Sequence, residues 1–501
     1  MSINDDLFDR FEALTFDDVV VIPGFSETLP DEVDTTATFA GDIELAVPLV
    51  SAAMDKVTEG RMAIAMARYG GIGVIHRNMS IADQASEVQK VKRSQSGMIT
   101  DPVTLPPTAL LHEAEALMHR FKFSGVPITD DEGHLVGILT NRDIRFCEGT
   151  DFDRPVTDFM TSDRLVTAAV GTSLDEAKLL LQEHRIEKLP LVDGVGCLAG
   201  LITVKDIQKR LDFPNASRDG KGRLRCAAAI GVGADVEERV DALVSMGVDA
   251  VSIDTAHGHS ANVIKTIERV KGSWPELAVT AGNVVTEDGV EALAKAGADA
   301  VKVGVGAGSI CTTRVVSGAG MPQLSAIYFA SKRAKEMGIP IIGDGGITFS
   351  GDIVKAITAG AETVMLGSLL AGVEESPGEM ELFEGRRYKS YRGMGSMGAM
   401  TGDSQDRYAT GQSSSSKSAV GAASQKLVPE GIEGRVPFSG PLGDVAYQLV
   451  GGLRSGMGYA GAATLAQLRS AKMMRVTTAG RQESHPHDVT ITKEAPNYQR
   501  T

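Results

Sequence analysis

The chain has few of the features expected of a secreted, membrane-spanning or metal-rich protein. Its 501 residues include only four cysteines, which lie far apart, so neither a disulfide framework nor a cysteine-rich zinc cluster is indicated. No apolar run approaches the roughly 20 residues that a membrane-spanning helix needs. The first residues are acidic where a signal peptide is basic. We therefore expect a cytoplasmic protein with no membrane partner.

Positive charge is also scarce. The chain carries 50 Lys and Arg residues against 65 Asp and Glu residues, a formal net charge of −15. Binding to nucleic acid without regard to sequence requires a basic surface that displaces counterions, so this class of function is disfavoured. An anionic ligand would instead have to be held at one place, by backbone amides and a few cations.

Aromatic residues make up only 5% of the chain, whereas 56 residues are glycine and 43% are hydrophobic. This composition is typical of an α/β protein with many tight turns. Eight short apolar runs recur, most of them followed by an amphipathic helical pattern, at residues 46–50, 71–75, 227–232, 250–253, 278–280, 300–305, 340–342 and 363–366. Buried strands that alternate with helices pair in parallel, and eight such units predict a closed (β/α)₈ barrel.

A block of about 120 residues interrupts this pattern between the second and third runs, and it contains an internal repeat. The stretch from residue 125 to residue 144 returns, with changes, at residues 188–207. We therefore predict three segments: the first part of the barrel at residues 1–93, an inserted module at 94–212, and the rest of the barrel at 213–501.

The repeat resembles a tandem cystathionine-β-synthase-type (CBS) module. In that family the Thr and Asp of the closing motif hold the ribose of a regulatory nucleotide, which points here to Thr140, Asp143, Thr203 and Asp206 and to an adenine or guanine nucleotide. The alternative is that the two aspartates only cap the helices that follow them. Both interpretations stay open on the sequence.

Residues 304–314 carry the strongest chemical signal. They place Cys311 on a loop after the sixth run, with glycines at 304, 306 and 308 that let the backbone bend or approach a ligand closely. A thiol is nucleophilic only as thiolate, a form that Arg314 and loop amides could stabilise. The alternative, a small buried hydrophobe, is less favoured because active sites of such barrels lie at the carboxyl ends of the strands.

Two glycine-containing turns follow the seventh and eighth runs, Asp344-Gly345-Gly346 and Gly367-Ser368. Glycine amides and a helix N-terminus at this end of a barrel commonly bind phosphate. The pattern fits flavin, sugar-phosphate and nucleotide enzymes equally well. Further along, residues 394–437 are irregular and rich in serine, and we predict that they form a mobile flap over the site.

Taken together and in order, the motifs resemble the inosine-5′-monophosphate (IMP) dehydrogenases, from the N-terminus to Tyr498. The resemblance rests on residues 14–19, 51–55, 308–314, 344–346, 391–396 and 407–408, and on the repeat-containing insert.

The resemblance implies a mechanism for the cysteine. In that family the loop cysteine, here Cys311, attacks C2 of the purine, and hydride then passes to NAD⁺ and leaves a covalent thioimidate. A flap pair, here Arg407 and Tyr408, then activates the water that releases xanthosine 5′-monophosphate (XMP). Thr313 and Glu430 form the second route to an activated water. The predicted activity is the NAD-dependent committed step of guanine nucleotide synthesis.

The same resemblance implies binding residues. Those for the substrate are Ser309, Asp344, Gly345, Gly346, Gly367, Ser368, Tyr391, Gly393, Met394, Gly395 and Glu430. Those for NAD are Asp254, Asn283, Gly304 and Gly306. A potassium ion would be held by Gly306, Gly308 and Cys311, together with Glu483, Ser484 and His485 of a neighbouring subunit. That site implies an oligomer, a homotetramer or an octamer.

Three alternatives remain at this stage. GMP reductase shares the cysteine loop, Thr313 and a glutamate like Glu430, but lacks the Arg407-Tyr408 pair. A nucleotide-sensing protein whose barrel only binds ligand would not need a reactive Cys311. A flavin-dependent barrel oxidoreductase would fit the phosphate-binding turns alone.

Overall fold

The computed structural model describes residues 12–94, 102–121, 123–400, 428–493 and 495–498. Its contacts divide the chain into two compact units. One comprises Met1–Lys92, Asn215–Ser217 and Leu224–Thr501, and the other comprises Arg93–Pro214 and Arg218–Arg223. Within the described ranges, no helix is both long enough and apolar enough to cross a bilayer.

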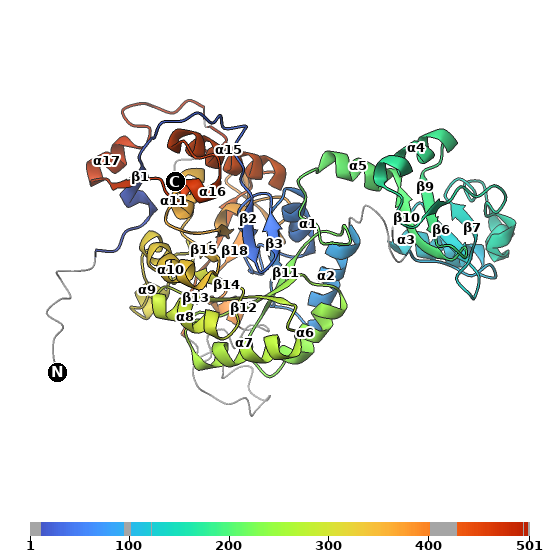
Figure 1. Cartoon of the computed structure of the whole chain (residues 1–501), viewed down its shortest axis with the longest axis horizontal. Coiled ribbons are helices and arrows are strands. Elements are labelled where there is room, and N and C mark those ends of the chain that lie inside the picture. Colours follow the sequence, from blue (N-terminus) through green and yellow to red (C-terminus); the bar gives the residue numbers. More distant parts are fainter. Residues whose placement is uncertain (1–11, 95–101, 122, 401–427, 494, 499–501) are drawn as a thin grey trace. The chain divides into compact units, whose positions relative to one another are not determined.

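A closed barrel of eight parallel strands forms the centre of the first unit (Figure 1). In barrel order the strands are β11 (Ala227–Ile230), β12 (Ala250–Asp254), β13 (Ala278–Val284), β14 (Ala300–Val303), β15 (Ile341–Asp344), β16 (Thr363–Leu366), β4 (Leu49–Ser51) and β5 (Ile72–Ile75). Each strand coincides with one of the eight apolar runs, so the predicted barrel is confirmed. Every strand residue except Asp344 is buried, as expected of parallel strands covered on both faces.

Helices cover the outside of the barrel in Figure 1 and bury their apolar faces against the strands. They are α1 (Gly60–Arg68), α2 (Ile81–Ser94), α6 (Val236–Ser245), α7 (Ala261–Ser273), α8 (Glu287–Lys295), α10 (Gln323–Met337), α11 (Ser350–Thr358), α12 (Ser368–Ala371) and α15 (Leu442–Ala460). The short helix α9 (Thr313–Val316) differs, because its two valines are exposed. The smaller elements at the chain's two ends are η2 (Phe16–Asp18), β1 (Val19–Val21), α16 (Leu465–Leu468), β20 (Met473–Arg475) and α17 (Thr478–Glu483).

A hairpin of β2 (Ala37–Ala40) and β3 (Ile43–Leu45) closes the amino end of the barrel. Phe39, Ile43 and Leu45 are buried and pack in one cluster with Ala250 and Ala278, the first residues of β12 and β13. Because side chains fill this end, a ligand can enter only at the carboxyl ends of the strands.

A three-stranded antiparallel sheet stands beyond the barrel and consists of β17 (Met380–Phe383), β18 (Arg386–Arg392) and β19 (Glu433–Pro437). Strand β18 ends at the residues that the sequence predicted for substrate binding, and α13 (Met397–Met400) follows them. β19 occupies the last part of the predicted flap, so residues 433–437 are a paired strand rather than a free loop.

The second unit contains two similar halves. One has α3 (Leu111–Phe121), β6 (Gly125–Thr129), β7 (Leu135–Thr140), η3 (Gly149–Asp153) and η4 (Val156–Asp158); the other has β8 (Ala168–Ala169), α4 (Leu174–His184), β9 (Lys188–Val192), β10 (Leu198–Thr203) and α5 (Val204–Asp212). Gly125 pairs with Thr140 and Lys188 with Thr203, at equivalent places in the two hairpins. The halves differ after the second strand, where turns replace the helix in the first half.

Candidate active site

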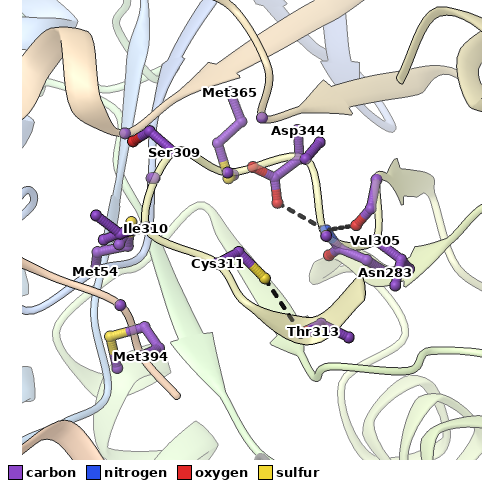
Figure 2. Close-up of a pocket in the computed structure, with 18 of the residues that line it drawn as sticks. Met54, Asn283, Val305, Ser309, Ile310, Cys311, Thr313, Asp344, Met365 and Met394 are labelled. Carbon is purple, nitrogen blue, oxygen red and sulfur yellow. Dashed lines mark hydrogen bonds between the residues drawn. The ribbon is translucent and has the colours of Figure 1, made fainter. Parts of the chain in front are cut away.

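A pocket opens at the carboxyl ends of the barrel strands (Figure 2). Many residues that the sequence predicted for catalysis or for substrate, NAD or metal binding line this pocket. They are Asp254, Asn283, Gly304, Gly306, Gly308, Ser309, Cys311, Thr313, Asp344, Gly345, Gly346, Gly367, Ser368, Tyr391, Gly393, Met394, Gly395 and Glu430. Most come from the last residues of barrel strands or from the loops that follow, and the barrel brings these together because all parallel strands end at the same rim. The others, from Tyr391 to Gly395 and Glu430, come from the end of β18 and from the segments next to β18 and β19.

Cys311 begins a chain of two hydrogen bonds. Its Sγ donates to Thr313 Oγ1 at 3.1 Å, and Thr313 Oγ1 donates to Glu430 Oε2 at 2.8 Å. A proton moved along these bonds would leave a thiolate on Cys311 and a neutral carboxyl group on Glu430. The arrangement therefore joins a nucleophile to a base through one hydroxyl group.

The loop that carries Cys311 is held by its own backbone and by Arg314. The Cys311 amide donates to the Gly308 carbonyl at 3.1 Å. Arg314 Nε donates to the Val305 carbonyl at 2.9 Å, and its Nη2 donates to the carbonyl of Met321. Burial lowers the pKa of Arg314. Arg314 therefore braces the loop, and its donors point to carbonyl oxygens rather than to the thiol as the sequence had suggested.

Glu430 reaches Cys311 because its segment lies between two loops. The Glu430 carbonyl accepts from the Thr312 amide at 3.0 Å, and the Glu430 amide donates to the Gly395 carbonyl at 3.0 Å. Gly431 forms an antiparallel bridge with Cys311. These backbone bonds fix the carboxylate although it lies 119 positions after the cysteine in the sequence.

The turn after β15 needs glycine. Gly345 and Gly346 have φ values of 93° and 81°, in the left-handed region that other residues rarely adopt. Asp344 precedes them, and its Oδ2 accepts from Asn283 Nδ2 at 2.8 Å. The turn therefore directs successive backbone amides and a carboxylate toward the pocket.

Tyr391 closes the opposite side of the pocket. It is 4% exposed, its hydroxyl donates to Met54 Sδ at 3.7 Å, and burial raises its pKa. A Cβ added to Gly367 would lie 2.9 Å from this hydroxyl, so the close approach requires glycine there. The phenol is therefore a neutral donor near the second glycine turn.

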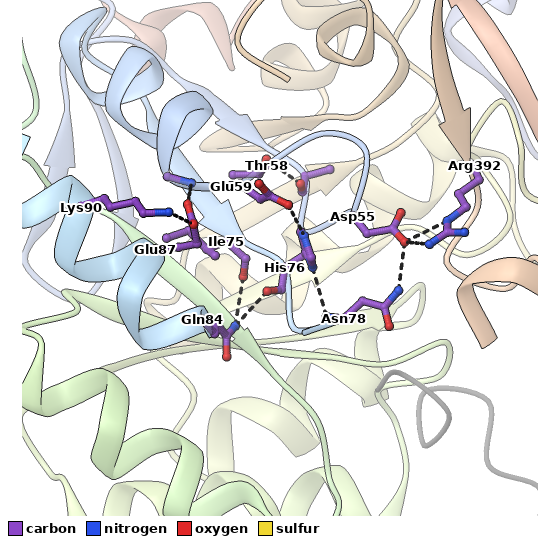
Figure 3. A network of polar contacts seen from close by, with 12 residues as sticks. Asp55, Thr58, Glu59, Ile75, His76, Asn78, Gln84, Glu87, Lys90 and Arg392 are labelled. Atoms are coloured by element: carbon purple, nitrogen blue, oxygen red, sulfur yellow. Dashed lines mark hydrogen bonds and ion pairs between the residues drawn. The ribbon is translucent and has the colours of Figure 1, made fainter. Parts of the chain in front are cut away.

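A polar network behind this wall connects three segments of the chain (Figure 3). Arg392 Nε donates to Asp55 Oδ2 at 2.9 Å, and Asn78 Nδ2 donates to the same oxygen at 2.9 Å. The Asn78 amide donates to His76 Nδ1, and His76 Nε2 lies 3.3 Å from Glu59 Oε1. Asp55 thus ties the end of β18, and with it residues 393–395, to the loop after β4.

Among the lining residues that the sequence interpretation did not single out are Thr255, Lys302 and Met365. Lys302 had a readable signal, because it is the one cation in an otherwise apolar strand pattern. Met365 had none, since a buried thioether looks the same in a core as in a pocket wall.

Other predicted residues lie elsewhere or are not described. Arg407 and Tyr408 fall in residues 401–427, outside the described residues. Glu483 ends α17, Ser484 follows it, and His485 Nδ1 lies 3.3 Å from Tyr498 Oη. Within this chain these three residues do not line the pocket, so their place in a potassium site between subunits stays a prediction.

The predicted nucleotide residues lie in the second unit. Asp143 Oδ2 accepts from both the amide and the hydroxyl of Thr140, each at 2.7 Å, and no helix follows it directly. The helix-cap interpretation is therefore wrong for Asp143, which closes a turn instead. Thr203 ends β10, and the side chain of Asp206 lies outside the described residues.

Comparison with known proteins identifies the family. Residues 13–487 match the model of the IMP dehydrogenase / GMP reductase domain. The chain is 57% identical over 489 residues to the inosine-5′-monophosphate dehydrogenase of Aquifex aeolicus, covering 97% of this chain and 98% of the relative. It is 55% identical over 490 residues to the enzyme of that name from Bacillus subtilis, with the same coverage.

A solved structure shows the same likeness. The chain superposes with a TM-score of 0.86 on a GMP reductase variant from Trypanosoma brucei in complex with guanosine 5′-monophosphate. That protein is 39% identical, and the match covers 96% of this chain and 99% of the other. The chain belongs to the IMP dehydrogenase / GMP reductase family.

Proposed function

We propose that the protein oxidises IMP to XMP with NAD⁺ as the hydride acceptor. The observation that carries the proposal is the chain of hydrogen bonds from Cys311 through Thr313 to Glu430, in a pocket that the glycine turns after β15 and β16 also line. Relatives named inosine-5′-monophosphate dehydrogenase, at 54–57% identity, support the choice of substrate.

The first step is attack by the thiol. Thr313 passes the Cys311 proton to Glu430, and the Sγ–C2 bond forms as the thiolate attacks and the π electron pair of the purine C2=N3 bond moves to N3; this double bond re-forms when hydride leaves. Asp344 accepts hydrogen bonds from the ribose hydroxyls, and the amides of residues 345–346 and 367–368 hold the phosphate. Binding of the ribose and the phosphate, which are remote from the reacting atom, places C2 against Sγ. This orientation supplies much of the rate enhancement.

The second step is loss of hydride from C2. NAD⁺ supplies the acceptor when bound beside Asn283 and Asp254, which line the same pocket. The thioimidate on Cys311 remains. Glu430 releases the first proton to solvent before hydrolysis. Water then attacks C2 and gives its proton to Glu430 through Thr313, the Sγ–C2 bond breaks, and the departing Cys311 sulfur takes a proton again. Arg407 and Tyr408 supply a second water-activating pair in this proposal.

A potassium ion fits the backbone of the cysteine loop. Carbonyl oxygens suit this ion, and the left-handed φ of 74° at Gly306 bends the loop that carries the carbonyls of Gly306, Gly308 and Cys311. The ion would order this loop. Its coordination would be completed by Glu483, Ser484 and His485 of a neighbouring subunit. This part of the proposal requires an oligomer, a homotetramer or an octamer.

In this proposal the inserted unit regulates the activity of the barrel by binding a nucleotide. Thr140 and Thr203 end the second strands of the two hairpins, at equivalent positions. Together with Asp143 and Asp206 they would receive the ribose of an adenine or guanine nucleotide. Mant-labelled ATP and GTP titrated against the protein and a Thr140→Ala variant would measure this binding.

GMP reduction is the second candidate, because the chain superposes closely on a GMP reductase. Absorbance at 340 nm separates the two activities. We expect NADH to form from IMP and NAD⁺, and no NADPH to be consumed with GMP. Consumption of NADPH with GMP, and no reaction with IMP, would reverse the assignment.

A further inference from the structure

Three charged residues occur in the eight barrel strands, and they form one cluster. They are Asp254 at the end of β12, Lys302 in β14 and Asp344 at the end of β15. Lys302 is the only cation among these strands and is 1% exposed. A buried charge is costly unless it is paired, so its retention in the barrel interior requires an explanation.

The ammonium group of Lys302 is fully occupied. Its Nζ donates to Asp254 Oδ1 at 2.7 Å, to Asp344 Oδ2 at 3.2 Å and to Asn283 Oδ1. An ammonium has three hydrogens and no acceptor, so these three oxygens use all of its donors. Lys302 is therefore placed as a fixed cation. It is not placed to act as a nucleophile or as a general acid.

Lys302 and Asn283 together orient one oxygen of Asp344. Oδ2 accepts from Lys302 Nζ and from Asn283 Nδ2, and Asn283 Nδ2 also donates to the Gly304 carbonyl at 2.7 Å. The other carboxylate oxygen, Oδ1, has no hydrogen-bond partner in the described part of the chain. The arrangement leaves Oδ1 for a ligand in the pocket that Asp344 lines.

The cluster carries two carboxylates and one ammonium, and both carboxylates are largely shielded from water. Their side chains are 5% and 21% exposed for Asp254 and Asp344. Without the ammonium, two like charges would face each other in a medium of low dielectric constant. One of them would then take up a proton more readily than it does beside the ammonium.

We propose that Lys302 is a positioning residue for nucleotide binding: it keeps Asp344 ionised and turned so that Oδ1 accepts from the ribose hydroxyls. The inference rests on the proposed function, since it takes IMP as the nucleotide. It predicts a pH dependence of IMP binding when Lys302 is neutralised. A protonated carboxyl is a poorer acceptor, so affinity falls as the pH falls.

Isothermal titration calorimetry with IMP, without NAD⁺, measures this step apart from the chemistry. The other titratable groups that line the pocket, Cys311, Tyr391 and Glu430, and the IMP phosphate are common to all variants. The readout is therefore the ratio of each variant's dissociation constant to that of the wild type, from about pH 8 down to about pH 6.

We expect Lys302→Met to bind IMP about tenfold more weakly than the wild type at neutral pH, as when one charge-assisted hydrogen bond is lost. The ratio should grow as the pH falls. Lys302→Arg keeps the charge and should show a ratio that does not change with pH. In the double variant Asp254→Asn with Lys302→Met only one carboxylate remains, so the pH dependence should disappear.

A constant ratio for Lys302→Met, or an undiminished pH dependence in the double variant, would overturn the inference. If Lys302→Met does not fold, as judged by thermal unfolding, the arginine and double variants still decide it: pH dependence in either contradicts the proposal. A purely packing role would weaken binding equally at every pH. Failure of the wild type to bind IMP would instead reject the proposed function.

Discussion

The direction of two hydrogen bonds determines what the Cys311 thiol can do. Its sulfur donates to Thr313, and Thr313 donates to Glu430, so in the proposed mechanism the proton would leave the thiol toward the carboxylate. One residue separates the cysteine from the threonine, but the glutamate comes from a distant segment. The Cys-x-Thr spacing could thus be read locally, whereas the third member became visible only through a family resemblance or the fold.

Replacing Thr313 by Val removes the relay hydroxyl with little change of shape. We expect the rate of NADH formation to fall by about 10²-fold at neutral pH, the contribution typical of general base catalysis. The rate of the variant should also rise more steeply with pH than that of the wild type, because solvent hydroxide has to remove the proton that Thr313 no longer passes on. Thr312→Val is the matched control, since its hydroxyl does not line the pocket. Equal pH–rate profiles for Thr313→Val and the wild type would disprove the relay.

Among the secondary-structure elements, strand β18 has the most influence on the site because it leads into residues 393–395. Its position depends on the ion pair between Arg392 and Asp55, whose side chains are 25% and 6% exposed (Figure 3). Hydrogen bonding to Asp55 raises the pKa of Arg392. Sequence patterns predicted the barrel strands but not this pair, because the two residues are 337 positions apart.

Asp55→Asn should therefore weaken IMP binding by about tenfold or more, because breaking a buried pair leaves an uncompensated charge next to the loop. Its melting temperature should also fall by several degrees. Glu381→Gln is the matched control, since it breaks the exposed pair with Arg435 on the same sheet, and exposed pairs contribute little. Equal IMP affinity in the two variants, measured by calorimetry, would contradict this role.

The pair of Glu59 and His76 predicts an acid sensitivity in the same region. The hydrogen bond from His76 lowers the pKa of Glu59 from 4.5 in the folded state. A lowered folded pKa gives stability that is present above pH 4.5 and is lost as the pH falls through the folded value. Melting temperatures of Glu59→Gln should thus lie below those of the wild type near neutral pH and converge with them in acid. A difference that stays constant down to pH 3 would refute this.

Across the whole molecule, the sequence predicted more of the barrel than of the insert. The eight recurring apolar runs predicted every barrel strand, because a strand that is buried on both faces has a continuously apolar sequence. The insert's hairpins were visible through their repeat, but the turns that replace a helix after β7 were not. Local sequence there is compatible with a helix cap at Asp143, but the hydrogen bond from the Thr140 amide to Asp143 closes a turn instead.

All described residues that we assign to catalysis lie in the first unit, which has its own hydrophobic core. A variant in which a short glycine-serine linker replaces residues 94–212 should therefore retain IMP oxidation within a few-fold of the wild-type kcat. It should also lose any response to adenine or guanine nucleotides. Loss of activity in a variant that still melts cooperatively would show that the insert contributes to the chemistry.

Covalent capture of the purine by Cys311 is the central step of the proposed mechanism. Acid quenching of the protein with IMP and NAD⁺ during turnover, followed by peptide mass spectrometry, measures that capture. We predict a nucleotide adduct on the peptide that contains Cys311, and neither adduct nor NADH in Cys311→Ala, whereas Cys197→Ser in the inserted unit should behave as the wild type does. NADH formation by Cys311→Ala at the wild-type rate would contradict the mechanism.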